Sequence, residues 1–378
     1  MRRQRVVEAD RRYLRLALAL AARGAGQTHP NPMVGAVVVR AGRVVGQGYH
    51  TRAGAPHAEA VALGQAGKRA RGAVLYVNLE PCCHFGRTPP CVDSIIGAGV
   101  RRVVACMRDP DPRVRGRGFR ALRAAGVEVR LGALLRDARI LNAEFVRRIG
   151  AGRPLVTLKA GMSLDGRIAT RAGESKWITS PRARAAARDL RLRHDAVLIG
   201  VNTVLRDDPL LTVRARRTEG ARRSGPVRVV LDARLRTPPR SRLLTDGGPQ
   251  TIIVTLKGAP TARRRRLQGA GALVLEVPGR DGQVSIPRAL EELGRRGIAS
   301  VLVEGGSEVL GAMLDERLAD RLVLFVAGRL LGGRGALPVF GGRGAGRLRD
   351  AALLKKITVR PVGRDYRIEG TLAFPRGD

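Results

Sequence analysis

Histidine, glutamate and cysteine side chains with the spacing of metal chemistry lie near the start of the chain. His57 and Glu59 stand two positions apart in "PHAEAVALGQAG", a stretch of small residues that predicts a helix. Cys82 follows a proline that ends an apolar run, and Cys91 opens a second predicted helix, "CVDSIIGAG". One imidazole and two thiolates form a zinc ligand set, and three protein ligands leave the fourth position open for a reactant. We therefore predict a catalytic zinc site formed by His57, Cys82 and Cys91.

Glu59 has the position of a proton carrier beside this zinc. An H-x-E sequence followed by P-C and a further cysteine is typical of zinc deaminases, in which the glutamate acts on protons and does not bind the metal. Here eight residues separate Cys82 from Cys91, whereas the signature has two. Zinc activates water, and Glu59 would take a proton from it and return the proton to the departing ammonia. The motif predicts hydrolytic deamination of an amidine carbon in a ring.

Other interpretations of these residues stay open at this point. His57 and Glu59 could form a solvated first turn, in which the helix dipole favours the carboxylate. A structural zinc closed by Cys83 or His84 would use the same ligands but would leave Glu59 without a role. A basic RNA-binding protein with a structural zinc predicts that Glu59→Gln has no effect on its function.

The segments around the motif predict alternating strands and helices. The stretch "VGAVVVRAGRVVGQGY" (34–49) has two β-rich runs around an Ala-Gly turn and predicts a hairpin. We expect further strands at 73–81 and 100–107, and further helices from residue 57, at 91–99 and near 116–126. The N-terminus predicts an amphipathic helix with an apolar stripe at Tyr13, Leu16, Ala17 and Leu20.

A second series of strands follows a Gly- and Pro-containing break, "RRIGAGRPL" (147–155), which predicts two domains, 1–149 and 150–378. Its strands are expected near 155–160, 196–200, 227–232, 251–255, 272–277, 300–304 and 321–326. The Gly-rich segment 329–348 has the composition of a loop. In "VLVEGGSEVLGAML" a buried strand, a glycine pair and a helix follow one another, so main-chain N–H groups could approach a pyrophosphate, although the G-x-G-x-x-G spacing is missing.

Composition limits the class of protein. With 44% hydrophobic but only 3% aromatic residues, the cores of this 378-residue chain must consist mostly of Val, Leu, Ala and Ile, which favours layered α/β packing. No stretch has the ~18 uncharged apolar residues of a membrane span. Arg15 interrupts the apolar run of the N-terminus, so we expect a folded helix there and not a signal peptide, and we expect a cytoplasmic protein.

The charge is strongly positive, with 70 Lys and Arg against 32 Asp and Glu, a net +38. Six of the 70 are lysine, so 64 are arginine, and they are scattered through every segment. Such scatter does not favour a nucleic-acid partner, which a basic stripe would indicate. We expect "ARRRRLQG" (262–269) to be an exposed helix face. A phosphorylated small substrate would still be attracted.

The motifs together resemble the RibD family of bifunctional riboflavin-biosynthesis enzymes. They are "THPNPMVGAVVV", "GYHTRAGAPHAEAVAL", "LEPCCHFGRTPPC", "MRDPDPRVRGRG", "SLDGRIAT", "GESKWITS", "TVLRDDPLLTVR" and "VLVEGGSEVLGAML". The resemblance covers about residues 10 to 370. The resemblance implies an N-terminal cytidine-deaminase-like α/β/α sandwich and a C-terminal α/β domain similar to dihydrofolate reductase. It implies zinc-dependent deamination of a diaminopyrimidinone ribotide, then NADPH-dependent reduction of its ribosyl chain to ribityl. It also allows a homo-oligomer.

Site residues follow from matching this chain to the family's motifs. The resemblance implies zinc ligands His57, Cys82 and Cys91, proton donor Glu59, and Asn31 against the pyrimidine. It implies NADPH contacts at Gly161, Trp177, Thr203, Asp207, Gly306, Ser307, Glu308, Val309, Leu310, Gly311 and Ala312, and substrate contacts at Ser175, Arg191, Leu211, Arg214 and Glu304. We expect hydride transfer to an open-chain imine of the ribose, assisted by Lys159 or Asp207. The chain departs from the family at Cys83 and Ala233, where serine is expected.

A zinc-dependent deaminase of a tRNA base is the alternative enzyme. The charge and the zinc motif would both allow it. The long Cys82 to Cys91 spacing and the second domain of more than 200 residues, which RNA editing does not require, argue against it.

Overall fold

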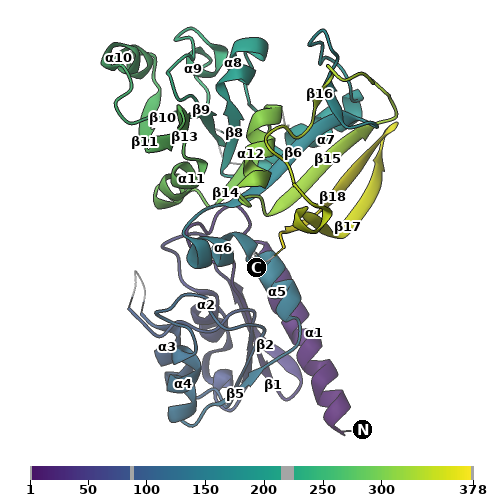
Figure 1. Cartoon of the computed structure of the whole chain (residues 1–378). Coiled ribbons are helices and arrows are strands. Elements are labelled where there is room, and N and C mark those ends of the chain that lie inside the picture. Colours follow the sequence, from purple (N-terminus) through teal and green to yellow (C-terminus); the bar gives the residue numbers. More distant parts are fainter. Residues whose placement is uncertain (1, 86–88, 214–224, 376–378) are drawn as a thin grey trace. The chain divides into compact units, whose positions relative to one another are not determined.

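The computed structural model describes residues 2–85, 89–213 and 225–375, with side chains of the first helix from residue 8 onward. The chain divides into two compact units, Met1–Gly152 and Arg153–Asp378. The boundary predicted between residues 149 and 150 falls inside a helix, α6 (Ala143–Ala151), next to this division. Each unit has its own large sheet with helices on both faces (Figure 1).

The N-terminal unit has a five-stranded sheet with the order β2-β1-β3-β4-β5. β1 (Gly35–Arg40) and β2 (Arg43–Tyr49) form the predicted hairpin. β3 (Val74–Val77) is antiparallel to β1 and parallel to β4 (Arg102–Ala105), so both further predicted strands are confirmed, although they are shorter than expected. β5 (Glu128–Leu131) is a strand that the sequence pattern misses, and it pairs parallel to β4.

Helices cover both faces of this sheet. One face packs against the predicted helices α2 (Ala58–Ala66), α3 (Cys91–Gly97) and α4 (Arg117–Ala124). The other packs against α1 (Arg2–Ala22), α5 (Leu135–Leu141) and α6. The apolar stripe of α1 is buried as predicted at Tyr13, Ala17 and Leu20, with Leu16 half-buried. The unit is therefore the expected α/β/α sandwich.

Two buried asparagines fix the segment that leads into β1. Asn78, which follows β3, accepts from the Gly35 N–H over 2.9 Å and donates to the Met33 carbonyl over 2.9 Å. Asn142, between α5 and α6, accepts from the Met33 N–H over 2.8 Å and donates to the same carbonyl over 3.0 Å. Backbone groups that no strand pairs are thus satisfied by side chains. Because Met33 is fixed in this way, the residues just before it are held at the end of the sheet where the candidate site lies.

The C-terminal unit has a nine-stranded sheet with the order β11-β10-β9-β8-β14-β6-β15-β18-β17. All seven predicted strands are confirmed and run parallel: β6 (Leu155–Ser163), β8 (Ala196–Gly200), β9 (Val227–Leu231), β10 (Thr251–Leu256), β11 (Leu273–Val277), β14 (Ser300–Val303) and β15 (Arg321–Ala327). The sequence pattern misses β17 (Leu353–Val362) and β18 (Asp365–Ala373), an antiparallel pair at one edge.

Helices again form a layer on each face. α11 (Ile286–Arg295) and α12 (Ser307–Asp315) pack on one face, over β6, β8, β14 and β15. α7 (Pro181–Asp189), α8 (Val201–Asp207), α9 (Arg242–Thr245) and α10 (Thr261–Gly269) pack on the other. This is the expected α/β domain, in which the helices that follow β8 and β14 begin beside each other at the carboxyl ends of neighbouring strands.

The Gly-rich segment 329–348 is mostly loop, as predicted, but its backbone is tied down. Asp165 accepts from the N–H groups of Leu331 and Gly332, and Asp315 at the end of α12 accepts from those of Arg343 and Gly344. These bonds hold the segment against the turn between β6 and β7 (Arg167–Ala169) and against the end of α12.

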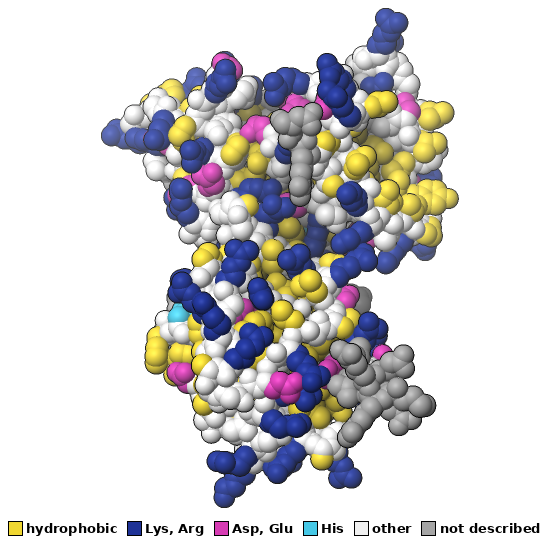
Figure 2. Space-filling view, turned by 60° about the horizontal axis from the view of Figure 1, so that its bottom comes forward, with side chains coloured by type: hydrophobic (Ala, Val, Ile, Leu, Met, Phe, Trp, Pro, Cys, Tyr) yellow, Lys and Arg dark blue, Asp and Glu magenta, His cyan; other side chains and the backbone are white. Residues whose placement is uncertain are grey.

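Basic side chains are distributed over the face seen in Figure 2 and do not form one stripe. The arginine-rich run lies on α10, where Arg263, Arg265 and Arg266 are exposed, so the predicted exposed helix face is confirmed. Among the helices of the described residues, none is long and apolar enough to cross a membrane.

Gly35 allows α1 to approach β1 closely. We therefore predict that a side chain at this position would lower the stability of the N-terminal unit. A Cβ on Gly35 would lie 2.1 Å from the Ala17 carbonyl oxygen, whereas a Cβ on Gly97, at the end of α3, would meet nothing within 4 Å. We expect Gly35→Ala to destabilise the N-terminal unit by about 2 kcal/mol because backbone must move. Calorimetry should show its unfolding midpoint lowered by about 4–8 °C. Gly97→Ala is the control, and an equal shift in both variants would contradict the packing argument.

Candidate functional sites

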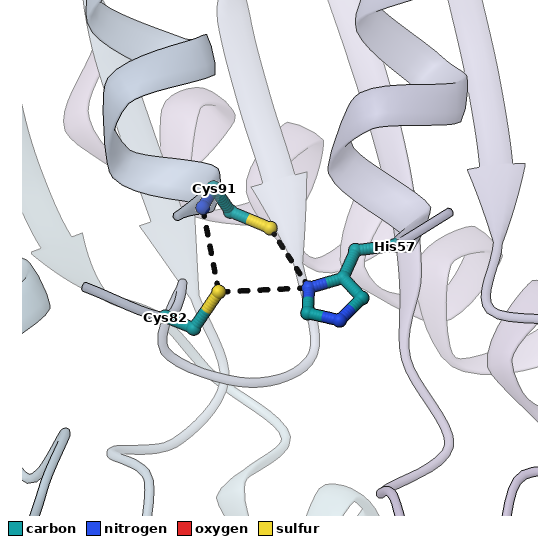
Figure 3. A group of neighbouring side chains, drawn as sticks. All are labelled: His57, Cys82 and Cys91. Atoms are coloured by element: carbon teal, nitrogen blue, oxygen red, sulfur yellow. Dashed lines mark hydrogen bonds between the residues drawn. The ribbon is translucent and has the colours of Figure 1, made fainter. Parts of the chain in front are cut away.

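His57, Cys82 and Cys91 meet at the carboxyl end of β3 (Figure 3). His57 Nδ1 lies 3.2 Å from Cys91 Sγ and 3.5 Å from Cys82 Sγ, and all three donor atoms lie within 4.8 Å of one another. Imidazole and thiolate donors suit zinc, and a set of three protein ligands would leave one position of the metal for a reactant. The residues present therefore fit the metal.

Local structure explains how the three donors converge. His57 is the extended residue that precedes α2, so its side chain leaves the helix at its N-terminus. Cys91 is the first residue of α3, and its backbone N–H donates to Cys82 Sγ over 3.3 Å. The Val92 N–H donates to the Cys82 carbonyl over 3.2 Å. The free N–H groups of one helix start thereby hold the loop that carries the other cysteine.

These contacts shift the pKa values of the two thiols in opposite directions. The pKa of Cys82 falls to about 4, because the Cys91 thiol and His57 hydrogen-bond its sulfur and outweigh the effect of burial. The pKa of Cys91 is raised, since its proton is shared with the Cys82 sulfur and the group is buried. The hydrogen bond to Cys82 raises the pKa of His57. Cys82 is thus the preformed thiolate of the set.

Glu59 lies in the first turn of α2 and is 4% exposed. Burial, followed by the nearby Cys82 charge, raises the pKa of its carboxyl to about 7. Glu59 faces the same cavity as two of the three donors, His57 and Cys82, and the volume of this cavity is about 320 Å³. The two neighbouring side chains suggested for closing a structural zinc, Cys83 and His84, are not part of the donor cluster among the described residues.

Asn31 lines this cavity opposite Glu59's helix. Its amide nitrogen lies 3.1 Å from His50 Nε2, and His50 Nδ1 lies 3.2 Å from the Pro56 carbonyl oxygen. The segment is further fixed by Arg148, which donates to the Pro30 carbonyl over 2.8 Å, and by the 2.9 Å pair of His29 with Glu144. Asn31 therefore presents its amide to the cavity in a fixed orientation.

Sequence reasoning gave no role to several polar residues of the cavity. They are His50, Glu80, Asp109, Asp111, Arg113 and Arg148. Buried Glu80 accepts from the N–H groups of Asp109, Gly116 and Phe119 and so fixes the loop that carries Arg113. The signal that could have found this loop was its motif "MRDPDPRVRGRG", whereas α6, which contributes Arg148, has no motif of its own.

In the C-terminal unit, Lys159, Arg191 and Glu304 form a buried ionic group. Leu158 on β6 pairs with Val303 on β14, so the next residues, Lys159 and Glu304, become neighbours. Glu304 Oε2 lies 3.3 Å from Lys159 Nζ, and both its oxygens accept from Arg191 over 2.6 and 2.8 Å. Burial alone would raise the pKa of Glu304, but the two cations lower it to about 2. One positive charge remains uncompensated within this group, which favours an anionic ligand.

The turn between β14 and α12 packs directly on the start of α8. A Cβ on Gly305 would lie 2.8 Å from Ile199 and 3.2 Å from the Thr203 hydroxyl, and one on Gly306 would lie 3.7 Å from that hydroxyl. The hydroxyl of Ser307 at the helix start is buried and has no hydrogen-bond partner among the described residues. The starts of α8 and α12 and a buried hydroxyl thus lie close together.

The other predicted α12 positions divide between this turn and the core. Glu308 is exposed and Val309 touches Gly200. Leu310 is in the core, Ala312 packs against it, and a Cβ on Gly311 would collide with the Gly341 carbonyl at 2.0 Å. Only the first turn of α12 can therefore offer side chains to a ligand.

Trp177, the single tryptophan of the chain, is 61% exposed and lies under the guanidinium of Arg184, 4.2 Å from the ring centre. Its neighbour Lys176 pairs with Asp207 over 2.9 Å, so Asp207 has a partner other than Lys159. Ser175 is half-buried in the same loop. Gly161 on β6 lies where a Cβ would be 3.3 Å from Thr179. The aromatic ring is therefore exposed and does not fill the core.

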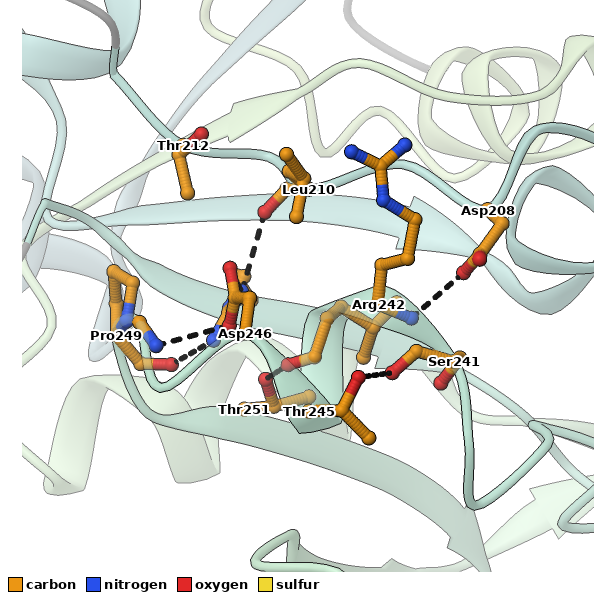
Figure 4. A network of polar contacts seen from close by, with 12 residues as sticks. Asp208, Leu210, Thr212, Ser241, Arg242, Thr245, Asp246, Pro249 and Thr251 are labelled. Atoms are coloured by element: carbon orange, nitrogen blue, oxygen red, sulfur yellow. Dashed lines mark hydrogen bonds and ion pairs between the residues drawn. The ribbon is translucent and has the colours of Figure 1, made fainter.

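Leu211 is buried, 4% exposed, with its φ at 53°, so only its backbone can meet a substrate. Its segment is anchored by the network in Figure 4: Arg228 donates to the Leu210 carbonyl over 3.2 Å and pairs with Asp246, while Asp208 accepts from the Arg242 N–H over 2.9 Å. The predicted contact Arg214 lies outside the described residues.

Comparison with known proteins agrees with this geometry. The model of the RibD C-terminal domain matches residues 154–367, and that of the cytidine and deoxycytidylate deaminase zinc-binding region matches 7–107. The riboflavin biosynthesis protein RibD of Aquifex aeolicus is 44% identical over 95% of this chain and 97% of its own length, and that of Escherichia coli is 42% identical over 94% and 97%. The chain belongs to the RibD family.

Solved structures of the RibD family resemble the whole chain. Acinetobacter baumannii RibD has a TM-score of 0.85 at 36% identity, covering 97% of this chain and 99% of that one. A deaminase/reductase of the family from Thermotoga maritima has a TM-score of 0.79 at 34% identity, with coverage of 97% and 99%. This RibD-family chain is a bifunctional riboflavin-biosynthesis enzyme with a zinc-dependent deaminase domain and a reductase domain, and the tRNA alternative is not favoured.

The zinc set can be tested by metal content. We expect about one zinc per chain in the wild type, and a large loss in Cys91→Ser because a two-donor site binds weakly. The matched control is Cys83→Ser, since the Cys83 sulfur faces the Arg113 carbonyl at 3.8 Å and lies outside the donor cluster. Elemental mass spectrometry of both purified variants measures this. Zinc lost from Cys83→Ser and kept by Cys91→Ser would contradict the assignment.

Proposed function

We propose that this chain deaminates 2,5-diamino-6-(5-phosphoribosylamino)pyrimidin-4(3H)-one and then reduces the ribosyl chain of the product, with NADPH as reductant, to give 5-amino-6-(5-phosphoribitylamino)uracil. The observation that carries the first step is the joint position of the donors His57 and Cys82 and of buried Glu59 in one cavity. The Thermotoga relative is named as a deaminase and reductase of these ribotides. The cavity and the ionic group supply the chemistry that both steps require.

In the deaminase site, His57, Cys82 and Cys91 would hold the zinc. Zinc, when bound there, supplies an electrophilic centre that makes water reactive at neutral pH. Glu59 takes the water proton and delivers it to the leaving nitrogen, and its buried side chain keeps this transfer away from solvent. Asn31, held by His50, hydrogen-bonds the pyrimidine edge.

Two arginines of the same cavity suit the substrate's phosphate. Arg148 donates one N–H to the Pro30 carbonyl, and its buried Nε has no hydrogen-bond partner among the described residues. Arg113 is anchored by Asp111 and is largely exposed at the cavity wall. Guanidinium groups match phosphate oxygens in pairs, so the ribotide would extend from Glu59 toward these side chains.

In the reductase domain, NADPH would lie along the glycine turn before α12, with Thr203, Trp177 and Gly161 beside it. NADPH, when bound, supplies the hydride. Arg191, Ser175 and the backbone at Leu211 would hold the ribotide, and Glu304 orients Arg191 through two hydrogen bonds. The Lys159 ammonium belongs to the same ionic group, with Glu304 and Arg191, and can assist the reduction of the ring-opened imine. Asp207 pairs with Lys176 and would thereby hold in place the loop that carries Trp177.

The deamination step is tested with Glu59→Gln in the zinc-loaded chain. We expect the rate to fall by about 10²- to 10⁴-fold because the proton carrier is lost. Mass spectrometry of the diaminopyrimidinone ribotide without NADPH follows the replacement of amine by carbonyl. Asp93→Asn, which removes an exposed carboxylate from the first turn of α3, is the control. Unchanged deamination in Glu59→Gln would leave the zinc structural.

The reduction step is tested with Lys159→Met on the deaminated substrate and NADPH. We expect the gain of two hydrogens to slow by about 10²-fold, since a charge beside the reacting carbon is removed. Lys257→Met, at the exposed end of β10, is the control. Deamination should be unaffected in both variants. An undiminished reduction rate in Lys159→Met would remove this residue from the mechanism.

A further inference from the structure

The loop before α7 presents its tryptophan to solvent with a cation on one face of the ring. The guanidinium of Arg184 lies over Trp177, 4.2 Å from the ring centre. Arg184 also donates to the Thr179 carbonyl over 2.6 Å, so two contacts fix the guanidinium. Trp177 is still 61% exposed although this face is covered. The opposite face of the indole is therefore open to a flat group of a ligand.

The start of α7 gives Arg184 a fixed base. Ser180 precedes α7; its hydroxyl accepts from the Ala183 N–H over 3.3 Å, and its N–H donates to buried Asp365 over 2.6 Å. The Arg184 N–H donates to the Ser180 carbonyl over 3.0 Å. The guanidinium over the indole therefore comes from a helix start that is tied to β18.

Trp177 belongs to the side of β6 on which the hydride would be received. Thr179, two residues further along the loop, packs against Gly161 on β6, where a Cβ would lie 3.3 Å from the Thr179 side chain. Positions two apart on a strand face the same side, so Lys159 and Gly161 share the side against which the loop packs. The flat group that the open indole face would meet is therefore the nicotinamide of the coenzyme.

The charge over the indole is not neutralised. Arg184 pairs with no carboxylate among the described residues, whereas Lys176 beside Trp177 is paired with Asp207 over 2.9 Å. A ring stacked at van der Waals distance on the open face would lie about 8 Å from the guanidinium. The reduced nicotinamide is neutral, but the oxidised ring is a cation. Because like charges repel across this distance, the guanidinium disfavours the oxidised ring alone.

We propose that Arg184 is a positioning residue that fixes the Trp177 ring against the nicotinamide and makes the reductase bind the reduced coenzyme more tightly than the oxidised one; this rests on the proposed reductase function. A ring that is already fixed lowers the entropy cost of binding for both forms. The uncompensated charge acts only on the oxidised form. Release of the oxidised coenzyme after each turnover is thereby favoured.

The binding of both coenzyme forms tests the effect of the charge. Titration calorimetry with NADPH and with NADP⁺ needs no turnover. We expect the preference of the wild type for NADPH to fall by about threefold in Arg184→Gln, as the lost repulsion implies. Arg184→Lys keeps a cation over the ring and should retain the preference. Arg193→Gln, which removes an exposed arginine from the short helix Leu190–Arg193 after α7, is the control. An unchanged preference in Arg184→Gln would overturn the proposal.

Fluorescence tests the positioning, because Trp177 is the single tryptophan of the chain and supplies a signal from this loop alone. In Arg184→Gln we expect the anisotropy of its emission to fall and its quenching by acrylamide to increase, and the Kd for NADPH to rise about three- to fivefold. Unchanged anisotropy and quenching would overturn the positioning role. If the wild type reduces no ribotide, the proposed reductase function fails, while the loss of coenzyme preference in Arg184→Gln would still support the role of Arg184.

Discussion

The hydrogen bond from the Cys91 backbone N–H to the Cys82 sulfur joins a strand end to a helix start, and the deaminase site depends on it. A sulfur that accepts N–H groups carries negative charge at low cost, so the loop after β3 is fixed by the same interaction that prepares a zinc ligand. The helix start can donate because its first N–H groups have no partner within the helix. Fold and metal chemistry therefore use one set of unsatisfied backbone groups.

The two domains use buried glutamates in opposite ways. At Glu59, burial and the nearby Cys82 charge outweigh the attraction of His57, so the pKa of this carboxyl rises to about 7. Glu304 is also largely removed from water, but Lys159 and Arg191 lower its pKa to about 2. Environment alone thus assigns the roles: a carboxyl whose pKa is close to neutrality can move a proton, whereas a permanently charged carboxylate can only orient its partners.

The sequence predicted the features that follow from patterns within short stretches of residues. The hairpin, the parallel strands and the cluster of His57, Cys82 and Cys91 follow from local patterns, since strand ends and helix starts must meet at one edge of a parallel sheet. It did not predict α5, α6, β5 or the β17-β18 pair, whose apolar patterns are weak and half-exposed. Nor could it show that Arg148 reaches Pro30, 118 residues away, or that Asp207 pairs with Lys176, because such contacts exist only after packing.

Cys83 shows why neighbouring thiols in one motif need not compete for the metal. Its backbone follows Cys82 directly, yet its side chain is not part of the donor cluster among the described residues. The Cys83 sulfur accordingly faces the Arg113 carbonyl, and burial together with Glu80 raises the pKa of this thiol. A protonated sulfur aimed away from His57 is a poor zinc ligand, while Cys82 is deprotonated and aimed toward it. The cysteine at position 83 therefore stays outside the donor set among the described residues.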